Sequence, residues 1–356
     1  MDSLRDSSNM GFWNGKKVLI TGHTGFKGSW LAFWLKESGA LVCGVSLDPI
    51  TSPSLWGELD LNLDGFDLRS DIRGSGWVKK VLEFQPEIVF HLAAQPLVVT
   101  GWNLPLLTFE TNVMGTANLL NELSQIASVE TILVVTTDKV YKLDGEKVAR
   151  TENSELGGKD PYAASKAAVE LLVDSWPLPN KISIATARSG NVIGGGDWSE
   201  DRLIPDIVRA GLTNKDLEVR FPTAIRPWQH VIEPIHGYMM LAEAIHSKKC
   251  NLKTLNFGPS FENQVTVEEI IAYCNEVLPL ELRFNKVLRA GKYYEGELLI
   301  LDSALAKNEI GWTPLLSWKE SVEMSLNWYV DLMRGRSARE LVSENIKYYL
   351  DKIGEI

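Results

Sequence analysis

The first half of the sequence predicts an α/β fold, in which helices cover both faces of a parallel sheet. Short apolar runs of strand length alternate there with segments whose apolar residues recur at helical spacing. Strands buried on both faces read as continuous apolar runs, and the helices between them cover the sheet. The expected strands are residues 17–21, 41–47, 87–92, 131–136 and 182–187, and the expected helices are residues 25–38, 77–84, 108–126 and 161–174.

The first strand and the helices carry clear boundary signals. The apolar run 17–21 ends at Gly22, as a buried strand leading into a turn does, and Gly39 ends the helix that follows. The residues that form the apolar side of this first helix are Phe26, Trp30, Leu31, Trp34 and Leu35. In the long helix 108–126 they are Val113, Leu119, Leu120 and Leu123.

The alternation weakens after about Ser189, where later helices at 234–245, 267–277 and 317–332 come with fewer strands. We therefore expect two domains without a flexible linker. Residues 12–189 and about 231–257 form the first domain, and residues 190–230 and about 258–350 form a smaller second one.

Composition is typical of a globular enzyme. The 356 residues are 45% hydrophobic and 23% charged, and the net charge of −10 without a basic tract argues against a nucleic-acid partner. The cysteines and histidines are too scattered for a disulfide framework or a metal site; they are Cys43, Cys250, Cys274, His23, His91, His230, His236 and His246. No stretch reaches the roughly 18 apolar residues of a membrane span, and the polar start lacks a signal-peptide core, so we expect a cytoplasmic location.

Three glycines at a 3-3 spacing separate the first strand from the first helix, in the segment Gly22-His23-Thr24-Gly25-Phe26-Lys27-Gly28. Glycine lets the backbone approach a pyrophosphate, whose charge then lies at the helix N-terminus. A turn needed only for packing gives the same pattern, but the position between strand and helix favours a dinucleotide site. The full fold prediction is therefore a Rossmann doubly wound parallel sheet with a smaller, mainly C-terminal α+β domain for the substrate.

Further cofactor contacts are expected where the next strands end. Asp48 follows the second strand, and a carboxylate there binds a ribose diol and disfavours a 2′-phosphate, which suggests NAD; a solvated turn aspartate explains it nearly as well. For His91 a structural role is a better interpretation than a catalytic one. The remaining candidates, which flank the adenine or allow close backbone approach, are Asp71, Ile72, Leu92, Ala93 and Ala94.

Tyr162 and Lys166 lie four residues apart, so they share one face of the helix 161–174. An ammonium near a phenol, together with a nicotinamide cation, is expected to lower the phenol pKa. Tyr162 then accepts the proton of a sugar hydroxyl while hydride leaves, and Lys166 also holds the nicotinamide ribose. Such a pair occurs often by chance, but it is informative in a chain that already has the cofactor loop.

Thr136, a further candidate for cofactor binding, ends the apolar strand 131–136. Thr137, Asp138 and Lys139 follow it, at the edge where ligands bind in open α/β sheets. Thr137 can bond the hydroxyl that becomes a ketone. Asp138, if burial raises its pKa, can protonate a leaving hydroxyl, and Lys139 can remove a proton next to the ketone or position a group that does so. A solvated ion pair in a turn is the alternative interpretation of Asp138 and Lys139.

Three functions are compatible with these motifs. A dehydratase uses all of them. A nucleotide-sugar 4-epimerase uses the loop, Tyr162 and Lys166 but needs no acid–base pair at Asp138 and Lys139. A non-catalytic NAD-binding or redox-sensing module needs none of the reacting residues, so their joint presence speaks against it.

With these residues in place, the chain resembles the extended short-chain dehydrogenase/reductase family and, within it, the CDP-glucose 4,6-dehydratases, from about Phe12 to about Pro314. The likeness is densest in residues 22–30, 136–141 and 160–162. More specific still are the segments 190–198, 201–206 and 226–231. The dTDP-glucose dehydratases carry glutamate where this chain has Lys139, and the difference favours the CDP-sugar branch.

The resemblance implies a cycle on CDP-glucose with NAD as cofactor. Tyr162 takes the C4 hydroxyl proton while the C4 hydride goes to NAD. Asp138 is the acid and Lys139 stands at the base position when the C5 proton and the C6 hydroxyl leave. Hydride then returns to C6, which gives CDP-4-keto-6-deoxy-D-glucose, a precursor of the deoxy sugars of surface polysaccharides such as the lipopolysaccharide O-antigen.

The resemblance also implies the substrate contacts and the assembly. Asn191, Arg202 and Arg226 match positions that meet the diphosphate and sugar, and a structural role is about as good an interpretation of each side chain. The other expected substrate-pocket residues are Gln95, Trp198, Leu203, Trp228, His230 and Tyr294. Tyr293-Tyr294-Glu295 departs from the family's histidine–glutamate pair. The helix 108–126 is the family's usual dimer surface, so a homodimer or homotetramer is expected, although its apolar side equally suits packing within one chain.

Overall fold

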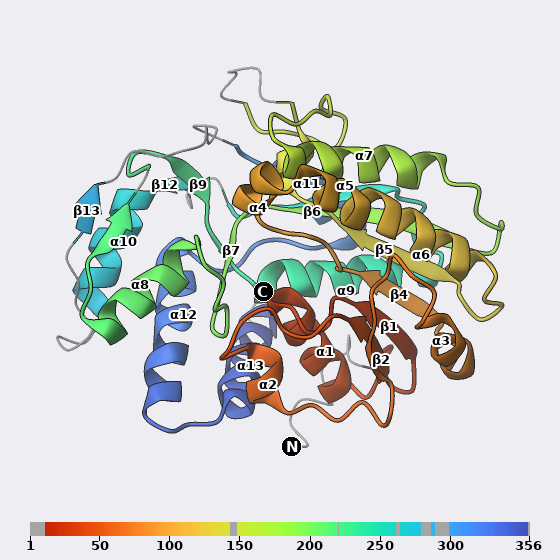
Figure 1. The fold of residues 1–356 in the computed structure, drawn as a ribbon, viewed down its shortest axis with the longest axis horizontal. Helices are drawn as coiled ribbons and strands as arrows, with labels where there is room; N and C mark the ends of the chain where they lie inside the picture. The colour runs from red at the N-terminus through yellow and green to blue at the C-terminus, as the bar shows by residue number, and fades with distance from the viewer. Residues whose placement is uncertain are drawn as a thin grey trace.

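The fold is given by a computed structural model, which describes residues 11–142, 148–219, 221–260, 264–278, 286–288 and 299–354 (Figure 1). A seven-stranded sheet of order β11-β6-β5-β4-β1-β2-β3 forms its centre, and every neighbouring pair is parallel. The predicted α/β class is therefore confirmed. The strands are β1 (Lys17–Thr21), β2 (Leu41–Ser46), β3 (Asp67–Arg69), β4 (Ile88–His91), β5 (Thr131–Val135), β6 (Ser183–Ser189) and β11 (Thr254–Phe257).

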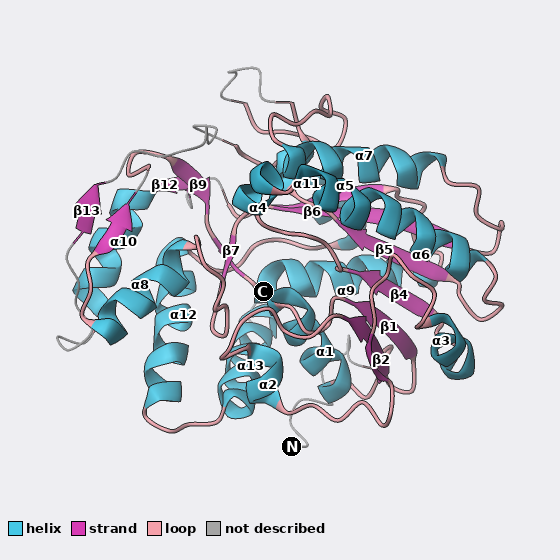
Figure 2. Cartoon of the chain, viewed as in Figure 1, coloured by secondary structure: helices cyan, strands magenta, loops and turns pink. Residues whose placement is uncertain are grey.

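Helices cover both faces of this sheet (Figure 2). Successive side chains of a strand point to opposite faces, so Val18 and Ile20 of β1 lie in one apolar core while Leu19 lies in the other. The first core is closed by α1 (Phe26–Glu37), α9 (Ile232–His246) and α13 (Ala338–Gly354). The second is closed by α3 (Val78–Phe84), α6 (Gly115–Ser124) and α7 (Pro161–Ser175).

The chain leaves the sheet after β6 and returns to it through α9 and β11, which pairs with β6 in the register Thr254↔Thr186. In the part of the chain that the structure describes, three two-stranded sheets lie outside the main one. They pair β7 (Val192–Ile193) with β10 (Gln229–His230), β9 (Ile225–Pro227) with β12 (Gln264–Thr266), and β8 (Leu217–Val219) with β13 (Lys286–Leu288). The helices beside them are α8 (Leu203–Thr213), α10 (Val267–Val277) and α12 (Trp318–Met333).

Several elements differ from the sequence-based expectation. The single helix expected at 108–126 is a continuous stretch of α5 (Pro105–Phe109), a π-helical turn η2 (Glu110–Met114) and α6. Helices α8 and α13 are absent from the sequence-based prediction. Helix α8 begins within the segment 201–206, which enters the prediction only through the family resemblance, and α13 is highly charged. The other short helices are α2 (Leu55–Leu59), α4 (Val98–Asn103), α11 (Ala304–Ile310) and η3 (Asp138–Val140).

Among the residues that the structure describes, none of the helices combines the length and the apolar character that crossing a membrane requires.

Candidate active site

The glycine loop between β1 and α1 is packed tightly against the end of β4. Gly22 has a φ of +76°, and a Cβ there would lie 2.7 Å from the backbone nitrogen of Ala93. A Cβ on Gly28 would lie 2.1 Å from the carbonyl oxygen of Gly22, closer than real contacts allow. Glycine is therefore required at Gly22 by conformation and at Gly28 by space.

The first turn of α1 suits an anionic group. Gly25 at the N-cap offers no side-chain bond to the helix, and the first turn contains no acidic residue. The first N–H groups of a helix have no intrahelical acceptor, and the helix dipole is positive there. The loop thus fits the pyrophosphate of a dinucleotide such as NAD.

The side chains of the loop anchor it to the protein. The Nε2 atom of His23 lies 2.8 Å from Asp67 Oδ1, and Thr24 Oγ1 donates to the carbonyl of Leu47 at 2.9 Å. Phe26 packs on the first core, and Lys27 Nζ donates to Ser189 Oγ at 2.7 Å. The side chains of these loop residues are therefore used within the protein.

Replacing Gly28 with alanine is expected to weaken NAD binding at least about tenfold and to lower the free energy of unfolding by about 1–3 kcal/mol, because the added methyl group collides with backbone. Calorimetric titration with NAD and urea unfolding measure both effects. Gly354→Ala, where a Cβ meets nothing within 4 Å, is the matched control. Parent-like NAD affinity in Gly28→Ala would refute the proposed role of the loop.

The other predicted cofactor positions lie around the ends of β2, β3 and β4. The Asp48 carboxylate is 85% exposed and lies 3.6 Å from Arg69 Nε. Asp71 accepts hydrogen bonds from the Arg73 guanidinium, which lower the Asp71 pKa, and Ile72 is buried. Beyond β4, Leu92 and Ala93 donate from their backbone nitrogens to Thr21.

His91 has the structural role expected of it. Its Nδ1 lies 2.6 Å from Thr21 Oγ1 and its Nε2 lies 2.8 Å from Thr116 Oγ1. Burial lowers the pKa of His91 to about 3, so the ring is neutral. It joins β1, β4 and α6 below the loop.

Thr137, Asp138 and Lys139 follow β5 at the carboxyl edge of the sheet. The short helix η3 begins here, and the Thr137 hydroxyl accepts a hydrogen bond from the Lys139 N–H at 3.4 Å. The same hydroxyl donates to Asp138 Oδ1 at 3.0 Å. Asp138 is only 3% exposed, whereas Lys139 is partly exposed. The interpretation of Asp138 as half of a solvated ion pair is therefore wrong.

Burial raises the pKa of the Asp138 carboxyl. The charges of Lys139, Arg226 and Lys27 and the hydrogen bond from Thr137 oppose this rise without cancelling it. The structure thus holds a carboxyl group that retains its proton to higher pH than an exposed aspartate, as a proton donor must.

Tyr162 and Lys166 lie on the face of α7 that meets this edge of the sheet. Asp160 caps the helix by accepting from the Ala163 N–H at 2.9 Å, and Pro161 occupies the first turn. Tyr162 is 9% exposed, and both Thr137 and the charge of Asp138 act on its phenol. The Tyr162 phenol therefore lies near Thr137 and Asp138, which are hydrogen-bonded to each other.

In the protein without the nicotinamide cation that the prediction includes, the Tyr162 pKa is raised. Burial raises the Tyr162 pKa to about 12, against the lowering effects of Thr137 and Arg202. The Lys166 ammonium donates instead to the carbonyl of Val135 at 3.1 Å, and burial lowers its own pKa to about 8. Desolvation of the phenol outweighs the neighbouring positive charges.

Both predicted arginines approach the reacting residues. The charge of Arg202 acts on Tyr162 and on Lys27, and that of Arg226 acts on Asp138. Arg202 Nη1 lies 3.5 Å from Asp197 Oδ2, and Arg226 Nη1 donates to the carbonyl of Ile225 at 2.9 Å. A positive field therefore surrounds the Asp138 carboxyl, which suits a substrate with a diphosphate.

Other predicted substrate residues are used within the protein. Gln95 bonds Leu97 and Thr108 with its amide, and Trp228 Nε1 donates to the carbonyl of Val265 at 3.3 Å. His230 is wholly buried edge-on against Trp30. Of the remainder, Asn191, Trp198 and Leu203 are partly exposed, and the segment Tyr293-Tyr294-Glu295 lies outside the described residues.

A buried ionic network supports the same edge of the sheet. Glu170 of α7 accepts from Arg188 of β6 at 2.8 Å and from Thr186 at 2.7 Å, and it also bonds Thr136. Arg188 donates in addition to the Tyr141 hydroxyl at 2.8 Å. These bonds fix α7, which carries Tyr162 and Lys166, against β5 and β6.

Glu170→Ala is expected to lower the free energy of unfolding by about 3–5 kcal/mol, because it leaves the Arg188 guanidinium buried without its carboxylate. Urea unfolding measures the loss. Asp174→Ala, which removes an exposed ion pair with Lys253 from the same helix, should change stability by less than about 1 kcal/mol. Equal effects of the two substitutions would contradict this interpretation of the network.

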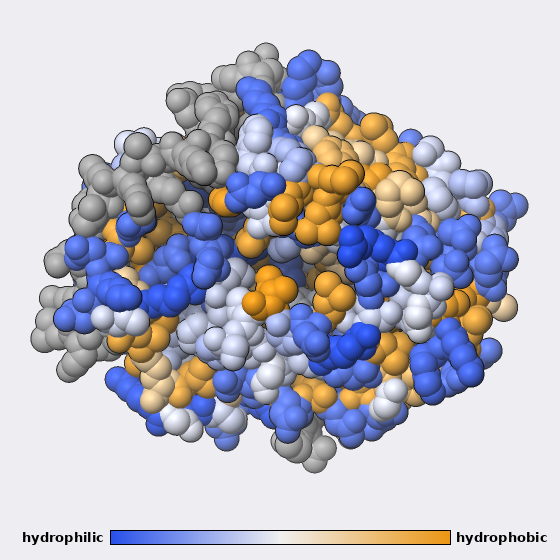
Figure 3. Space-filling view, viewed as in Figure 1, coloured by the Kyte–Doolittle hydropathy of each residue, from blue (hydrophilic) through white to orange (hydrophobic). Residues whose placement is uncertain are grey.

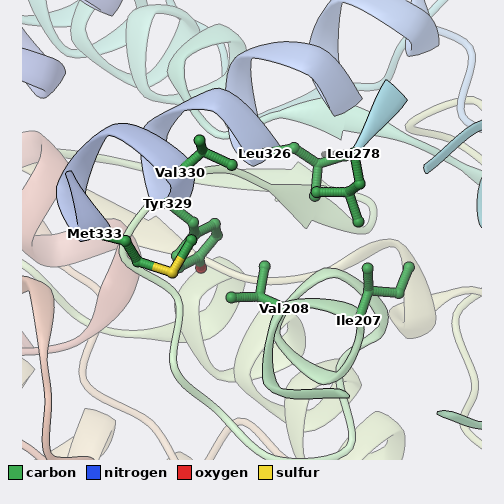
Figure 4. Close-up of a pocket in the computed structure, with 7 residues that line it drawn as sticks. All are labelled: Ile207, Val208, Leu278, Leu326, Tyr329, Val330 and Met333. Carbon is green, nitrogen blue, oxygen red and sulfur yellow. The ribbon is translucent and has the colours of Figure 1, made fainter. Parts of the chain in front are cut away.

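An apolar pocket between α8 and α12 is separate from these residues (Figure 4). It is lined by Ile207, Val208, Leu278, Leu326, Tyr329, Val330 and Met333. The Tyr329 hydroxyl donates to the carbonyl of Asp197, so the pocket backs the loop that holds Asp197 and Arg202. The pocket supports the site through this loop, and none of its lining side chains is one of the reacting groups.

Sequence reasoning missed three buried polar residues near the site. Asn112 of η2 donates to Ser165 at 2.8 Å and accepts from the Gln95 N–H at 2.7 Å. The hydroxyl oxygens of Ser189 and Tyr238 lie 2.6 Å apart, and both accept hydrogen bonds from Lys27 Nζ. No local sequence pattern identifies these residues. A polar residue within an apolar helix or strand indicates that it has a buried hydrogen-bond partner, but the pattern does not show which residue the partner is.

Comparison with known proteins agrees with this geometry. Residues 18–256 match the NAD dependent epimerase/dehydratase family, and the chain belongs to that family. NAD is therefore its cofactor, as predicted. The chain is 38% identical over 352 residues to a CDP-glucose 4,6-dehydratase of Salmonella typhimurium, covering 95% of this chain and 97% of the relative.

Solved structures share the fold at low identity. An epimerase from Methanothermobacter thermautotrophicus superposes with a TM-score of 0.79 at 23% identity, covering 94% of this chain and 96% of the other. A dTDP-glucose 4,6-dehydratase from Bacillus anthracis, solved with NAD, gives 0.73 at 21% identity, covering 89% and 97%. The family match and the 38% identical relative confirm the resemblance inferred from the sequence motifs.

Proposed function

We propose that the protein converts CDP-D-glucose to CDP-4-keto-6-deoxy-D-glucose and water. One observation supports this above all: the Tyr162 phenol lies near Thr137, whose hydroxyl donates to a buried Asp138 carboxyl of raised pKa. A base for oxidation and an acid for water loss therefore lie in one site. The 38% identical relative is named as an enzyme of this activity.

The Gly22–Gly28 loop would hold NAD, which would supply the hydride chemistry of the cycle: hydride would be taken from C4 of the glucosyl unit and returned to C6, with a proton returned to C5. Tyr162 takes the proton of the C4 hydroxyl, and the Lys166 ammonium supports the phenolate that this role requires. Thr137 bonds the oxygen that becomes the ketone, which then makes the C5 proton acidic.

Water leaves through the acid and base that follow β5. Asp138 gives its proton to the C6 hydroxyl while the C6–O bond breaks. Lys139 takes the C5 proton or positions the group that takes it. Asp138 gives up one proton and the base takes one proton from C5. Elimination therefore releases one water molecule and leaves the total charge of the site unchanged.

The two domains divide the ligands in this proposal. Residues 12–189 and about 231–257 hold NAD, and residues 190–230 and about 258–350 hold the nucleotide sugar. Arg202 and Arg226 are the proposed diphosphate contacts, because both guanidinium charges reach the reacting residues. Asn191 and Leu203 flank them.

We also propose that the chain forms a homodimer or homotetramer in the cytoplasm. Apolar residues gather on the surface over α4, α5 and α7 (Figure 3). The exposed large apolar residues in and beside these helices include Leu104, Leu106, Met114 and Leu171, and Leu106 is 71% exposed. Contiguous exposed apolar side chains of this kind suit a subunit interface.

Incubation with CDP-glucose tests the activity directly, because the 4-keto-6-deoxy product absorbs near-ultraviolet light in alkali. Parallel incubations with dTDP-glucose and UDP-glucose test the choice of base. Formation of CDP-galactose would instead show a 4-epimerase, the second candidate, which shares the loop, Tyr162 and Lys166. A product from dTDP-glucose alone would reject the CDP assignment.

A further inference from the structure

A buried polar cluster beside the reacting residues has no part in this cycle. Lys27, in the first turn of α1, donates from Nζ to Ser189 Oγ at 2.7 Å and to the Tyr238 hydroxyl at 3.2 Å. Ser189 ends β6 and Tyr238 lies in α9, and both are almost wholly buried. The backbone of Lys27 belongs to the Gly22–Gly28 loop, but its side-chain amino group is held in the protein interior by Ser189 and Tyr238.

The cluster lies next to Asp138. Gly190 follows Ser189, and a Cβ built on Gly190 would lie 3.2 Å from Asp138 Oδ2. The Asp138 carboxyl thus lies against the residue that follows the hydrogen-bond partner of Lys27. The two groups also affect each other: the Lys27 charge lowers the Asp138 pKa, and the Asp138 charge raises the Lys27 pKa.

Burial and the charges of Arg202 and Lys166 nevertheless lower the Lys27 pKa to about 7. A desolvated amine of this kind is costly unless an anion compensates for it. Among the charges that act on Lys27 in the described part of the chain, that of Asp138 is the negative one. Thr137 and Lys139 act on Asp138 from its own segment, and Arg226, Tyr162 and Tyr238 interact with it from other elements.

We propose that Lys27 is a positioning residue whose ammonium, held by Ser189 and Tyr238, stabilises the carboxylate that Asp138 becomes when it protonates the leaving hydroxyl. Lys27 transfers no proton in this step. The proton moves from the Asp138 carboxyl to the C6 oxygen, the C6–O bond breaks, and the nearby ammonium acts electrostatically on the negative charge left on Asp138. This role rests on the proposed dehydration.

The test is the titration of Asp138 without substrate. Infrared spectra of protein with ¹³C-carboxyl aspartate show the protonated carboxyl, and its loss in Asp138→Asn assigns the Asp138 band. Because a nearby cation lowers a carboxyl pKa, Lys27→Met should move the Asp138 midpoint upward by about one pH unit. Lys27→Arg should stay closer to the parent, and Lys36→Met, in the same helix, should leave the midpoint unchanged.

The effect of Asp138 on the Lys27 pKa can also be measured. This measurement needs no substitution at Lys27, so it tests the proposal even if Lys27→Met fails to fold. Interacting groups shift each other, and NMR of ¹³C-labelled lysine should show a lower Lys27 pKa in Asp138→Asn. An Asp138 midpoint that is equal in the parent and Lys27→Met, or a Lys27 pKa unmoved by Asp138→Asn, would overturn the proposal. Inactivity on CDP-glucose would instead reject the proposed function, since neither titration uses substrate.

In the active enzyme, Lys27→Met should raise the Asp138 pKa, as it should in the titration without substrate. Water loss needs the protonated carboxyl, so its rate falls as pH rises through the Asp138 pKa. Lys27→Met should shift that alkaline limb to higher pH and slow elimination by up to about tenfold at neutral pH, because the weaker acid donates less readily. A purely structural role for Lys27 would lower the rate without moving the limb.

Discussion

Asp138→Asn is expected to slow loss of the C6 hydroxyl by about 10²- to 10⁴-fold, the usual contribution of a positioned acid, while C4 oxidation stays detectable. The amide keeps the shape of the side chain and its bond to Thr137 but has no acidic proton. Rapid mixing with CDP-glucose should therefore show reduced nicotinamide absorbance that rises and persists, with little 4-keto-6-deoxy product.

The control for this substitution is Asp174→Asn, at an exposed position of α7, which should behave like the parent. The pH dependence gives a second check. Because the Asp138 pKa is raised, the parent should keep its elimination rate up to higher pH than an ordinary aspartic acid allows, and Asp138→Asn should lose that alkaline limb. Parent-like water loss in Asp138→Asn would show that another group is the acid.

Tyr162→Phe is expected to lower the rate of C4 oxidation by about 10²- to 10⁴-fold, because no phenol remains to accept the hydroxyl proton. Unlike Asp138→Asn, it should block the cycle before any reduced nicotinamide appears. Stopped-flow absorbance in a single turnover separates the two variants. In the parent, oxidation should quicken as pH rises toward the Tyr162 pKa, since the base must be deprotonated.

Tyr348→Phe, at an exposed position of α13, is the matched control and should oxidise C4 at the parent rate. NAD affinity should also be retained in Tyr162→Phe, because the Gly22–Gly28 loop is unchanged. If Tyr162→Phe reduced bound nicotinamide as fast as the parent, the proton acceptor would have to be another group near Thr137.

The central part of the fold could be predicted because short-range hydrophobic patterns in the sequence determine where its strands and helices lie. Five strand runs buried on both faces and four amphipathic segments were enough to place the sheet and the Gly22–Gly28 loop. The position of Asp138 at the carboxyl end of β5 followed from the same pattern. Strand β3 and helix α13 could not be predicted, because β3 spans three partly exposed residues and the apolar side of α13 is interrupted by charges.

The charge states in the site could not be predicted from residue spacing. The four-residue interval between Tyr162 and Lys166 correctly places both on one helix face, yet the pKa of Tyr162 rises because its burial dominates. Burial and partners depend on elements distant in the sequence, as the contacts of Lys27 with β6 and α9 show. Sequence motifs identified the reacting groups, whereas their electrostatics required the folded chain.

The most direct test of the account follows one deuterium atom. CDP-glucose labelled with deuterium at C4 should give CDP-4-keto-6-deoxyglucose with the label at C6, because the hydride taken from C4 returns within the same site. NMR and mass spectrometry of the product locate the label. Deuterium retained at C4 of a CDP-hexose, or lost to the solvent, would contradict an oxidation, elimination and reduction on one sugar.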